Sequence, residues 1–179
     1  MKICGIDLSM TSPAICVSDT EDFKNAMVFF YTPKKKFQHS WGNIHGMTAL
    51  KYKTAEERYD NLSEWVMNIL RKLDVTHVCI EGYSMGSKSG LVLNIAENGG
   101  LLKHKMWKEG IEFINPAPTS VKKFFTGKGN ANKILMHESF VSKTGVDVSR
   151  LLDSKIDGNP VSDIVDSYAM MLYGFEHFK

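Results

Sequence analysis

The order of strand-like and helix-like segments is the feature that most limits how this chain can fold. Three short apolar segments near the N-terminus, separated by turn residues, are close enough to pair as an antiparallel meander; they are residues 2–8, 13–18 and 26–32. After a long helical pattern, strand-like and helical segments alternate. This order predicts an α/β fold in which a mixed five-stranded sheet, with three antiparallel strands followed by parallel strands, is flanked by helices.

Helical periodicity is strongest over residues 55–73. Apolar side chains recur there at three- and four-residue spacing, and Thr54 with Glu57 forms a capping box, which is typical of a helix start. Strand 75–81 is apolar on both faces, as expected of a central strand covered by helices. The other predicted elements are a short strand at 111–114 and helices at about 90–108, 118–125, 131–143 and 161–177.

Residues 33–53 fit neither periodicity. The segment contains several lysines, with Phe37 and Trp41 between them. We interpret it as an inserted excursion, a solvated and partly disordered loop. The alternative is that it holds an arm of DNA through phosphate contacts and stacking. The lysines concerned are Lys34, Lys35, Lys36, Lys51 and Lys53.

Length and composition indicate a single domain, residues 1–179, with a normal core, because 43% of the 179 residues are hydrophobic. The formal charge of +2 permits nucleic-acid binding without arguing for it. Cys4, Cys16 and Cys79 lack the spacing of a zinc site, so we expect reduced core residues. The N-terminus enters a strand directly and no long apolar span follows, which predicts a cytoplasmic protein that does not cross a membrane.

The histidines show neither metal-ligand nor catalytic-triad spacing. We expect His77 in a strand and the others on the surface, namely His39, His45, His104, His137 and His177. A serine nucleophile elbow, a Walker loop and a dinucleotide fingerprint are also missing from the sequence.

Four carboxylates occupy positions that suit a metal-dependent nuclease. Asp7 lies inside the first apolar strand, and Glu81 ends the second apolar run. Asp163 and Asp166, three residues apart, project from one face of the last predicted helix near its start, where the helix dipole favours negative charge. An acid in an apolar strand is costly unless a cation or several hydrogen bonds compensate it. We therefore predict one shared metal centre, although Asp163 alone would suit a helix N-terminus and Glu81 alone a solvent-facing strand end.

Magnesium is the metal that such a set of oxygen ligands suits. Catalysis by two divalent ions requires ligands from separate elements that hold the ions roughly 3.5–4 Å apart. We predict two Mg²⁺ ions bridged by Asp7 and held also by Glu81, Asp163 and Asp166, with Mn²⁺ as a substitute. The ions would activate a water for in-line attack on a phosphodiester and stabilise the leaving 3′ oxygen.

A glycine-rich turn with lysines precedes the helix predicted at 131–143. The turn, residues 127–130, exposes free N–H groups at the helix start, and such groups attract phosphate. Lys128 and Lys133 add positive charge, and Lys122 lies one or two turns earlier. A surface lysine face with a glycine cap would give the same pattern, but next to an acidic site the segment also suits binding of a polyanion.

The segment 118–133 fits the pattern P-x-x-V-K-x-x-x-x-G-x-G-x-A-x-K. This pattern resembles the RuvC family of Holliday-junction resolvases, which have the RNase H-like fold. The resemblance also takes in Gly-Ile-Asp-Leu-Ser at 5–9, Val-Cys-Ile-Glu-Gly at 78–82 and Ser-Asp-Ile-Val-Asp-Ser-Tyr-Ala at 162–169. It therefore covers most of the chain apart from about 33–53.

The resemblance implies a role for each matching position. Asp7, Glu81, Asp163 and Asp166 take the places of the family's metal-binding, catalytic acids, and Lys122 and Lys133 match two of its lysines. RuvC-like enzymes are homodimers that use Mg²⁺ or Mn²⁺ to nick two opposed strands of a four-way DNA junction, leaving 5′ phosphates. The helix at about 90–108 would form the dimer interface, and a plain core helix is the alternative.

The chain also departs from the family's pattern. After Asp7 it reads Leu-Ser-Met, where the bacterial enzymes have Pro-Gly, and the position of the family's aromatic wedge, about three residues after Glu81, holds Ser84. Tyr83 suits two roles equally, as a replacement wedge that contacts DNA or as a residue packed under the loop. For Met85 packing is favoured. These differences, with the small size and the excursion, are more typical of a phage-type member.

Together these features predict a metal-dependent, structure-selective DNA endonuclease that resolves four-way or other branched junctions by paired nicking. One alternative keeps the fold and the metals but acts on RNA, an RNA–DNA hybrid, or flap and fork DNA. Another is a branched-DNA-binding protein without catalysis. The four intact acids disfavour the last alternative, and the G-x-G-x-A-x-K segment favours the junction enzymes.

Overall fold

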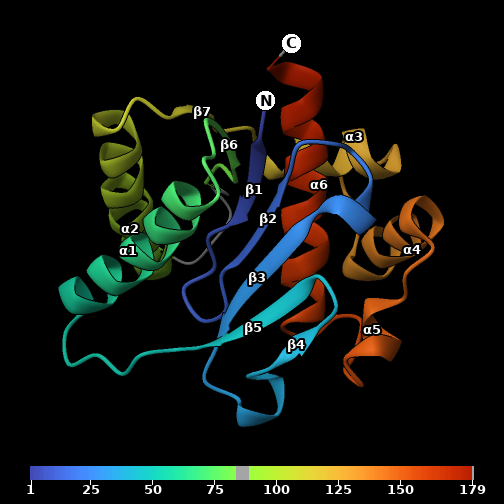
Figure 1. Cartoon of the computed structure of the whole chain (residues 1–179), viewed down its shortest axis with the longest axis horizontal. Helices are drawn as coiled ribbons and strands as arrows, with labels where there is room; N and C mark the ends of the chain where they lie inside the picture. Colours follow the sequence, from blue (N-terminus) through green and yellow to red (C-terminus); the bar gives the residue numbers. More distant parts are fainter. Residues whose placement is uncertain (84–88, 179) are drawn as a thin grey trace.

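A mixed sheet lies at the centre of the structure, a computed structural model that describes residues 1–83 and 89–178 (Figure 1). Its strands are β1 (Ile3–Asp7), β2 (Ala14–Ser18), β3 (Met27–Thr32), β4 (Ser40–Trp41), β5 (Ile44–Thr48), β6 (His77–Ile80) and β7 (Glu112–Ile114). Their order across the sheet is β4-β5-β3-β2-β1-β6-β7. β1, β2 and β3 pair antiparallel in sequence, and β6 and β7 extend the sheet parallel to β1. The predicted meander followed by parallel strands is confirmed.

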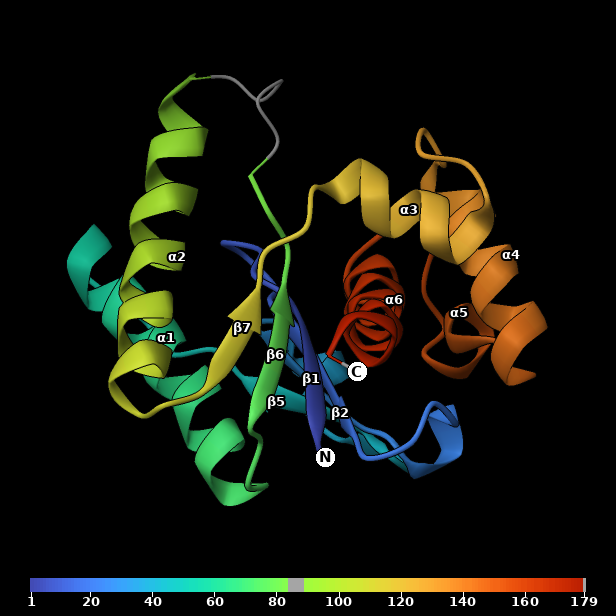
Figure 2. The ribbon, with the colours of Figure 1, turned by 90° about the horizontal axis from the view of Figure 1, so that it is seen from above.

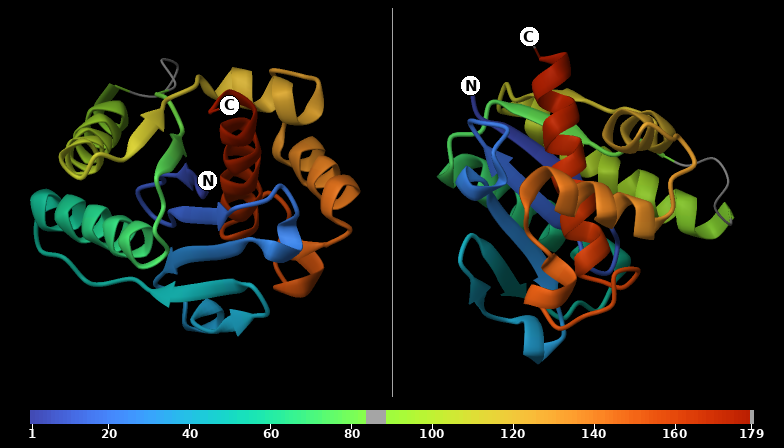
Figure 3. Two further views of the ribbon diagram at one scale, coloured as in Figure 1. Left: turned by 45° about the horizontal axis from the view of Figure 1, so that its top comes forward. Right: turned by 90° about the vertical axis from the view of Figure 1, so that its right-hand side faces the viewer.

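Helices cover both faces of the sheet (Figure 2). They are α1 (Ala55–Lys72), α2 (Ser89–Lys108), α3 (Pro118–Thr126), α4 (Lys133–Thr144), α5 (Val148–Leu151) and α6 (Val161–His177). One core, which includes Ile6 and Leu70, lies under α1 and α2; the other, which includes Phe30 and Phe140, lies under α6. α3 and α4 pack on the side of α6 away from the sheet (Figure 3). Apart from the short α5, these helices were predicted from the sequence.

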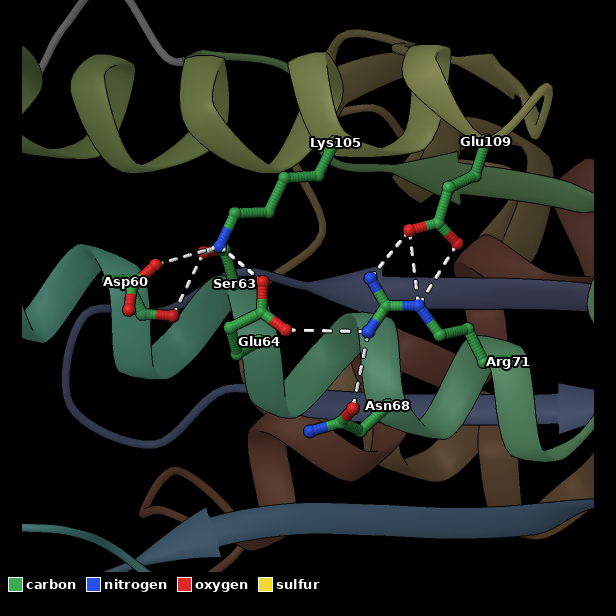
Figure 4. Close-up of polar contacts among 7 residues, drawn as sticks. All are labelled: Asp60, Ser63, Glu64, Asn68, Arg71, Lys105 and Glu109. Atoms are coloured by element: carbon green, nitrogen blue, oxygen red, sulfur yellow. Dashed lines mark hydrogen bonds and ion pairs between the residues drawn. The ribbon is translucent and has the colours of Figure 1, made fainter.

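Ion pairs join α1 to α2 and to Glu109, the residue that follows α2 (Figure 4). Lys105 Nζ lies 2.9 Å from Asp60 Oδ1 and 2.6 Å from Glu64 Oε1. Arg71 contacts Glu109 Oε1 at 2.5 Å and Glu64 Oε2 at 3.4 Å. Because these pairs run along both helices, they align α2 with α1 on this side of the sheet.

Close contact between β1 and α6 depends on glycine. A Cβ atom at Gly5 would lie 2.1 Å from the Ser167 carbonyl oxygen and 2.2 Å from the Met171 backbone nitrogen. One at Gly174 would lie 2.7 Å from Ile3 Cγ2. Glycine at both positions therefore lets the helix backbone rest directly on the strand, with the two running antiparallel.

The interpretation of residues 33–53 as a partly disordered loop is wrong. The segment forms a 3₁₀ turn at Lys35–Phe37 and the strands β4 and β5, and β5 pairs parallel with β3. This is why the sheet of the described residues has seven strands rather than the five predicted. The physical reason is that Phe37 and Ile44 are 1% and 0% exposed and extend the core, while the free edge of β3 supplies backbone partners.

Two smaller predictions have opposite outcomes. Cys4, Cys16 and Cys79 are free and buried, as expected of core residues. His137 was expected on the surface, but it is buried in α4, with Nε2 3.2 Å from Asp147 Oδ1. Its side chain belongs to the inner face of that helix. The spacing of the histidines bears on metal binding and catalysis but not on burial, so it could not indicate this placement.

One edge of the sheet collects several strand ends. β1, β3, β5, β6 and β7 all run in the same direction, because β3 is antiparallel to β2 and β2 is antiparallel to β1. Their C-terminal ends therefore lie along one edge, which we call the carboxyl edge; it includes Asp7, Thr32 and Ile114. α6 begins at the same edge, since its later turns contact the start of β1.

Candidate catalytic metal site

The four predicted acids meet at the carboxyl edge. Asp7 is the last residue of β1, and Glu81 follows the neighbouring β6, where its backbone N–H donates to the Ile6 carbonyl at 3.3 Å. Asp163 and Asp166 lie in the first two turns of α6. Since Gly5 faces the later turns of the antiparallel α6, Asp7, two residues further along β1, faces the turns that carry these two acids.

Burial raises the pKa values of all four acids, and repulsion from neighbouring acids adds to this effect for Asp7, Glu81 and Asp166. For Asp7, which is 8% exposed, burial has the largest effect, and the charges of Asp163, Glu81 and Asp166 raise its pKa further. Burial followed by the charges of Glu81 and Asp163 raises the pKa of Asp166 to about 7. The pKa of Glu81 is also raised, mainly by burial. The four carboxylates are therefore close enough to feel one another's charge, which agrees with a shared site.

A directional chain of hydrogen bonds holds Asp163. Ser12 Oγ donates to Asp163 Oδ2 at 2.6 Å and accepts from Asn159 Nδ2 at 2.5 Å. Ser162 Oγ lies 3.2 Å from Asn159 Oδ1 and accepts from Lys133 Nζ at 3.2 Å. The chain thus runs from the Lys133 ammonium to the Asp163 carboxylate. Burial raises the pKa of Asp163 to about 6, while the Ser12 hydroxyl and Lys133 act to lower it.

Backbone contacts hold Glu81. Asn115, which follows β7, donates from Nδ2 to the carbonyl oxygens of Ile80 and Glu81, both at 3.0 Å. The Gly82 N–H donates to the Pro116 carbonyl at 2.8 Å, and a Cβ at Gly82 would lie 2.6 Å from that oxygen. The chain on both sides of this acid is therefore fixed to the strand next to it.

The sequence analysis missed Ser12, Asn159, Ser162 and Asn115. Each is a small polar residue of a kind that is common in turns and at helix starts. What makes them part of the site is their contact with residues far along the chain, such as the 151 positions between Ser12 and Asp163. The sequence carries no local signal for such contacts.

The donor set fits a divalent metal ion. All four side chains supply hard carboxylate oxygens, and burial is the main cause of their raised pKa values, so a bound cation would favour their charged forms. Within residues 1–83 and 89–178, however, no three His, Cys, Asp or Glu side chains already stand in an arrangement that could hold a metal. The chemistry of the donors, rather than a formed coordination sphere, is what favours a metal here.

Two of the three predicted DNA-contacting lysines lie beside the acids. Lys133, the first residue of α4, bonds Ser162 and lowers the pKa of Asp163 through its charge. Lys122 of α3 lowers the pKa of Glu81 in the same way. Lys122 and Glu81 both line a groove of about 290 Å³. Lys128 is exposed in the turn between α3 and α4.

Tyr83 packs against α2. Its hydroxyl donates to the Ala96 carbonyl at 3.3 Å, and Lys103 Nζ lies 4.6 Å from the centroid of its ring. A Cβ at Gly99 would come within 2.8 Å of the hydroxyl, which explains a glycine in the middle of this helix. Of the two roles open for Tyr83, packing is the one that this conformation adopts. Ser84 and Met85, the other wedge positions, lie outside the described residues.

The mixed sheet, with acids at the C-terminal ends of β1 and β6 and on the helix that packs against β1, defines an α/β domain with the RNase H-like fold. Residues 43–172 match the sequence model of the family described as "Crossover junction endodeoxyribonuclease RuvC". This match spans well over half of the chain, and the chain belongs to the RuvC family. The predicted family and fold are confirmed.

Curated relatives agree with this membership, and a solved structure agrees with the fold. The chain is 29% identical over all of its 179 residues to the Crossover junction endodeoxyribonuclease RuvC of Sulfurovum sp. (strain NBC37-1), covering 98% of that protein. It is 26% identical over 134 residues to the protein of the same name from Wolinella succinogenes, which is 75% of this chain and 77% of the relative. The structure described as "T. thermophilus RuvC in complex with Holliday junction substrate" has a TM-score of 0.69 at 17% identity, with 99% of this chain and 96% of that chain covered.

Family membership also bears on metals and membranes. The RuvC family implies dependence on a divalent metal ion, which agrees with the oxygen donors at the carboxyl edge. None of the helices described is both long and apolar enough to span a bilayer.

Proposed function

We propose that this chain is a metal-dependent endonuclease that resolves four-way DNA junctions by paired nicking. The observation that carries the proposal is the meeting of four buried or partly buried acids, from β1, from the end of β6 and from α6, in a RuvC-family fold. An acidic cluster at the end of a covered sheet has no stabilising role, since like charges there oppose folding. Its value lies in holding cations next to a polyanionic substrate.

Asp7, Glu81, Asp163 and Asp166 are the residues that would hold the metal, as two Mg²⁺ ions that Mn²⁺ can replace. When bound, these ions supply an activated water and stabilise the leaving oxygen. The protein orients the acids: Ser12 fixes one oxygen of Asp163, and the backbone on both sides of Glu81 is tied to the strand beside it. Cleavage would leave a 5′ phosphate and a 3′ hydroxyl.

Lys122, Lys128 and Lys133 are the proposed phosphate contacts. The first and last lie beside the acids, so they can neutralise phosphates on either side of the scissile bond. Tyr83 is a proposed DNA contact as well. For that role its ring would have to leave the Ala96 carbonyl and the Lys103 ammonium.

Paired nicking requires a two-fold enzyme, and α2 is the proposed dimer interface. On this helix Leu93 is 65% exposed and Trp107 is 70% exposed, so apolar surface is available for a partner copy. We also propose a cytoplasmic location, the compartment that contains the chromosomal or viral DNA.

One experiment tests the activity directly. Labelled four-way junction, fork, duplex and RNA–DNA hybrid are incubated with the protein, with Mg²⁺ or with EDTA. We expect Mg²⁺-dependent cleavage of the junction at two opposed strands, and we expect Asp7→Asn to bind the junction without cutting it. Preferential cleavage of the hybrid would favour the RNase H-type alternative. Tight junction binding without cleavage in Mg²⁺ or Mn²⁺ would favour a non-catalytic binding protein.

A further inference from the structure

A pocket that is lined in part by polar side chains lies on the carboxyl edge beside the acid cluster. It has a volume of about 170 Å³ and is lined by Thr11, Ser12, Thr32, Pro33, Lys34, Asn159 and Pro160. None of these lining residues is acidic. Ser12 lines the pocket and also donates a hydrogen bond to Asp163, so only the Ser12 side chain separates the pocket from this acid.

Lys34 brings positive charge to this pocket without a carboxylate partner. Its Nζ lies 5.9 Å from the centroid of the Phe37 ring, and the Nζ of Lys36 lies 4.6 Å from the same centroid. Phe37 is 1% exposed, so the short turn that carries these lysines is anchored to the core. Across the described ranges, no acid forms an ion pair with Lys34, Lys35 or Lys36. Their charge is free to meet an anion.

The sheet geometry sets the distance between this charge and the acids. β3 is two strands away from β1, and both end at the carboxyl edge. With neighbouring strands about 4.8 Å apart, the end of β3 lies roughly 10 Å from Asp7. Phosphates of one DNA strand advance only about 3.4 Å each along the helix axis, so a strand cut at the acids has other phosphates within this reach.

We propose that Thr11, Lys34 and Asn159 form a subsite for a backbone phosphate of the cleaved strand, close to the scissile phosphate. The Asn159 amide donates from Nδ2 to Ser12 Oγ and accepts at Oδ1 from Ser162 Oγ, so the second N–H of Nδ2 is available to a ligand. The Thr11 hydroxyl is a second donor and the Lys34 ammonium supplies the charge. This subsite gives the excursion at 33–53 a function, because its first turn brings the cation to the carboxyl edge. The inference rests on the proposed nuclease function.

The first test is Lys34→Ala, compared with Lys24→Ala. Lys24 is also an exposed lysine, within a 3₁₀ turn where Lys34 directly precedes one, but it lies between β2 and β3, at the opposite edge of the sheet. Affinity for a fluorescent four-way junction is measured by anisotropy in EDTA over a range of KCl concentrations. We expect Lys34→Ala to weaken binding roughly two- to fivefold. It should also make the plot of log affinity against log salt less steep, reducing the magnitude of its negative slope by about 0.9, the value for one phosphate contact. Lys24→Ala should match the wild-type protein.

The second test locates the phosphate. Junctions with a single neutral methylphosphonate at each position around the cleavage site are bound to wild-type protein, Lys34→Ala and Thr11→Val. At one or two positions near the cut, the neutral linkage should weaken the wild-type protein but have little further effect on Lys34→Ala. Equal losses for wild-type and Lys34→Ala at every position would overturn the subsite, as would an unchanged affinity and salt slope in Lys34→Ala.

The two proposals fail in different ways. If the wild-type protein neither binds nor cuts any junction in Mg²⁺, the nuclease function is wrong and the subsite with it. If the wild-type protein cuts junctions in Mg²⁺ while Lys34→Ala binds every methylphosphonate junction as the wild type does, only the subsite is wrong.

Discussion

Charges are arranged in opposite ways in two regions of the molecule. Between α1 and α2, Arg71 and Lys105 pair with acids at distances of 2.5–3.4 Å, and most of the side chains involved are well exposed. At the carboxyl edge, four acids lie together in buried surroundings, and Lys122 and Lys133 offset their charge only in part. Exposed opposite charges contribute little to stability, whereas buried like charges oppose folding. The first arrangement therefore serves structure, and the second has to serve function.

The largest difference in cleavage activity between the two regions should appear when one acid is neutralised at the carboxyl edge and one between α1 and α2. Asp166→Asn should lower Mg²⁺-dependent cleavage by at least about a hundredfold, because it removes a metal ligand at the reaction centre. The same change should raise the melting temperature in EDTA at pH 8, since it removes buried repulsion. Glu64→Gln, the matched change between α1 and α2, should leave cleavage unchanged. The comparison fails if Asp166→Asn is as active as Glu64→Gln.

Loss of the Ser12 hydroxyl should have an intermediate effect. Ser12→Ala frees Asp163 from its 2.6 Å hydrogen bond and breaks the chain that reaches Lys133. Partners that orient a metal ligand typically contribute 10- to 100-fold to metal affinity or activity, so we expect a loss of this size. Mg²⁺ titration of cleavage and Mn²⁺ binding by calorimetry separate weaker metal binding from slower chemistry. Ser12→Thr, which keeps a hydroxyl, should retain most of the activity, and equal defects in both variants would contradict the positioning role.

The pH dependence of stability should also distinguish the regions. The pKa values of Asp163 and Asp166 are raised to about 6 and about 7 in the folded protein, against roughly 4 for an unfolded aspartate. Between about pH 4 and pH 7 the folded state therefore holds more protons than the unfolded state, so stability should fall as pH rises and then level off.

Melting temperatures in EDTA, measured from pH 4 to pH 8, test this sign. Asp166→Asn should flatten the decline, and added Mg²⁺ should raise the melting temperature most at the alkaline end, because it binds only the folded acids. Glu64→Gln should keep the wild-type slope. A melting temperature that rises through this window in EDTA would show that the acids do not repel one another as described.

The same contrast explains what the sequence could predict. Asp7 and Glu81 were recognisable because an acid within or after an apolar strand is locally unusual, and the helical spacing of Asp163 and Asp166 is equally local. The long helices followed from periodicity. Ser12 and Asn159 were missed, because their role depends on contacts with residues about 150 positions away. The division of the chain into one domain stays a prediction.

The excursion at 33–53 shows the limit of periodicity for short strands. β4 has two residues and β5 has five, among them a glycine and a histidine, so neither carries a clear alternation. Their strand character comes from the free edge of β3 and from the burial of Phe37, both of which are tertiary effects. A strand of this kind is defined by its neighbour rather than by its own residues.

The smallest effect should come from the ion pairs between α1 and α2. Arg71→Ala removes contacts with Glu64 and Glu109, and Arg71 and Glu64 are 43% and 41% exposed. Exposed pairs contribute about 0.2–1 kcal/mol each, so urea unfolding should show a loss of at most about 2 kcal/mol, with cleavage unchanged. The loss should shrink in high salt, because screening weakens such pairs in the wild-type protein. If Arg71→Ala instead reduced junction cleavage severalfold at unchanged stability, the alignment of α2 would matter for activity, and the separation between structural and functional charges would not hold.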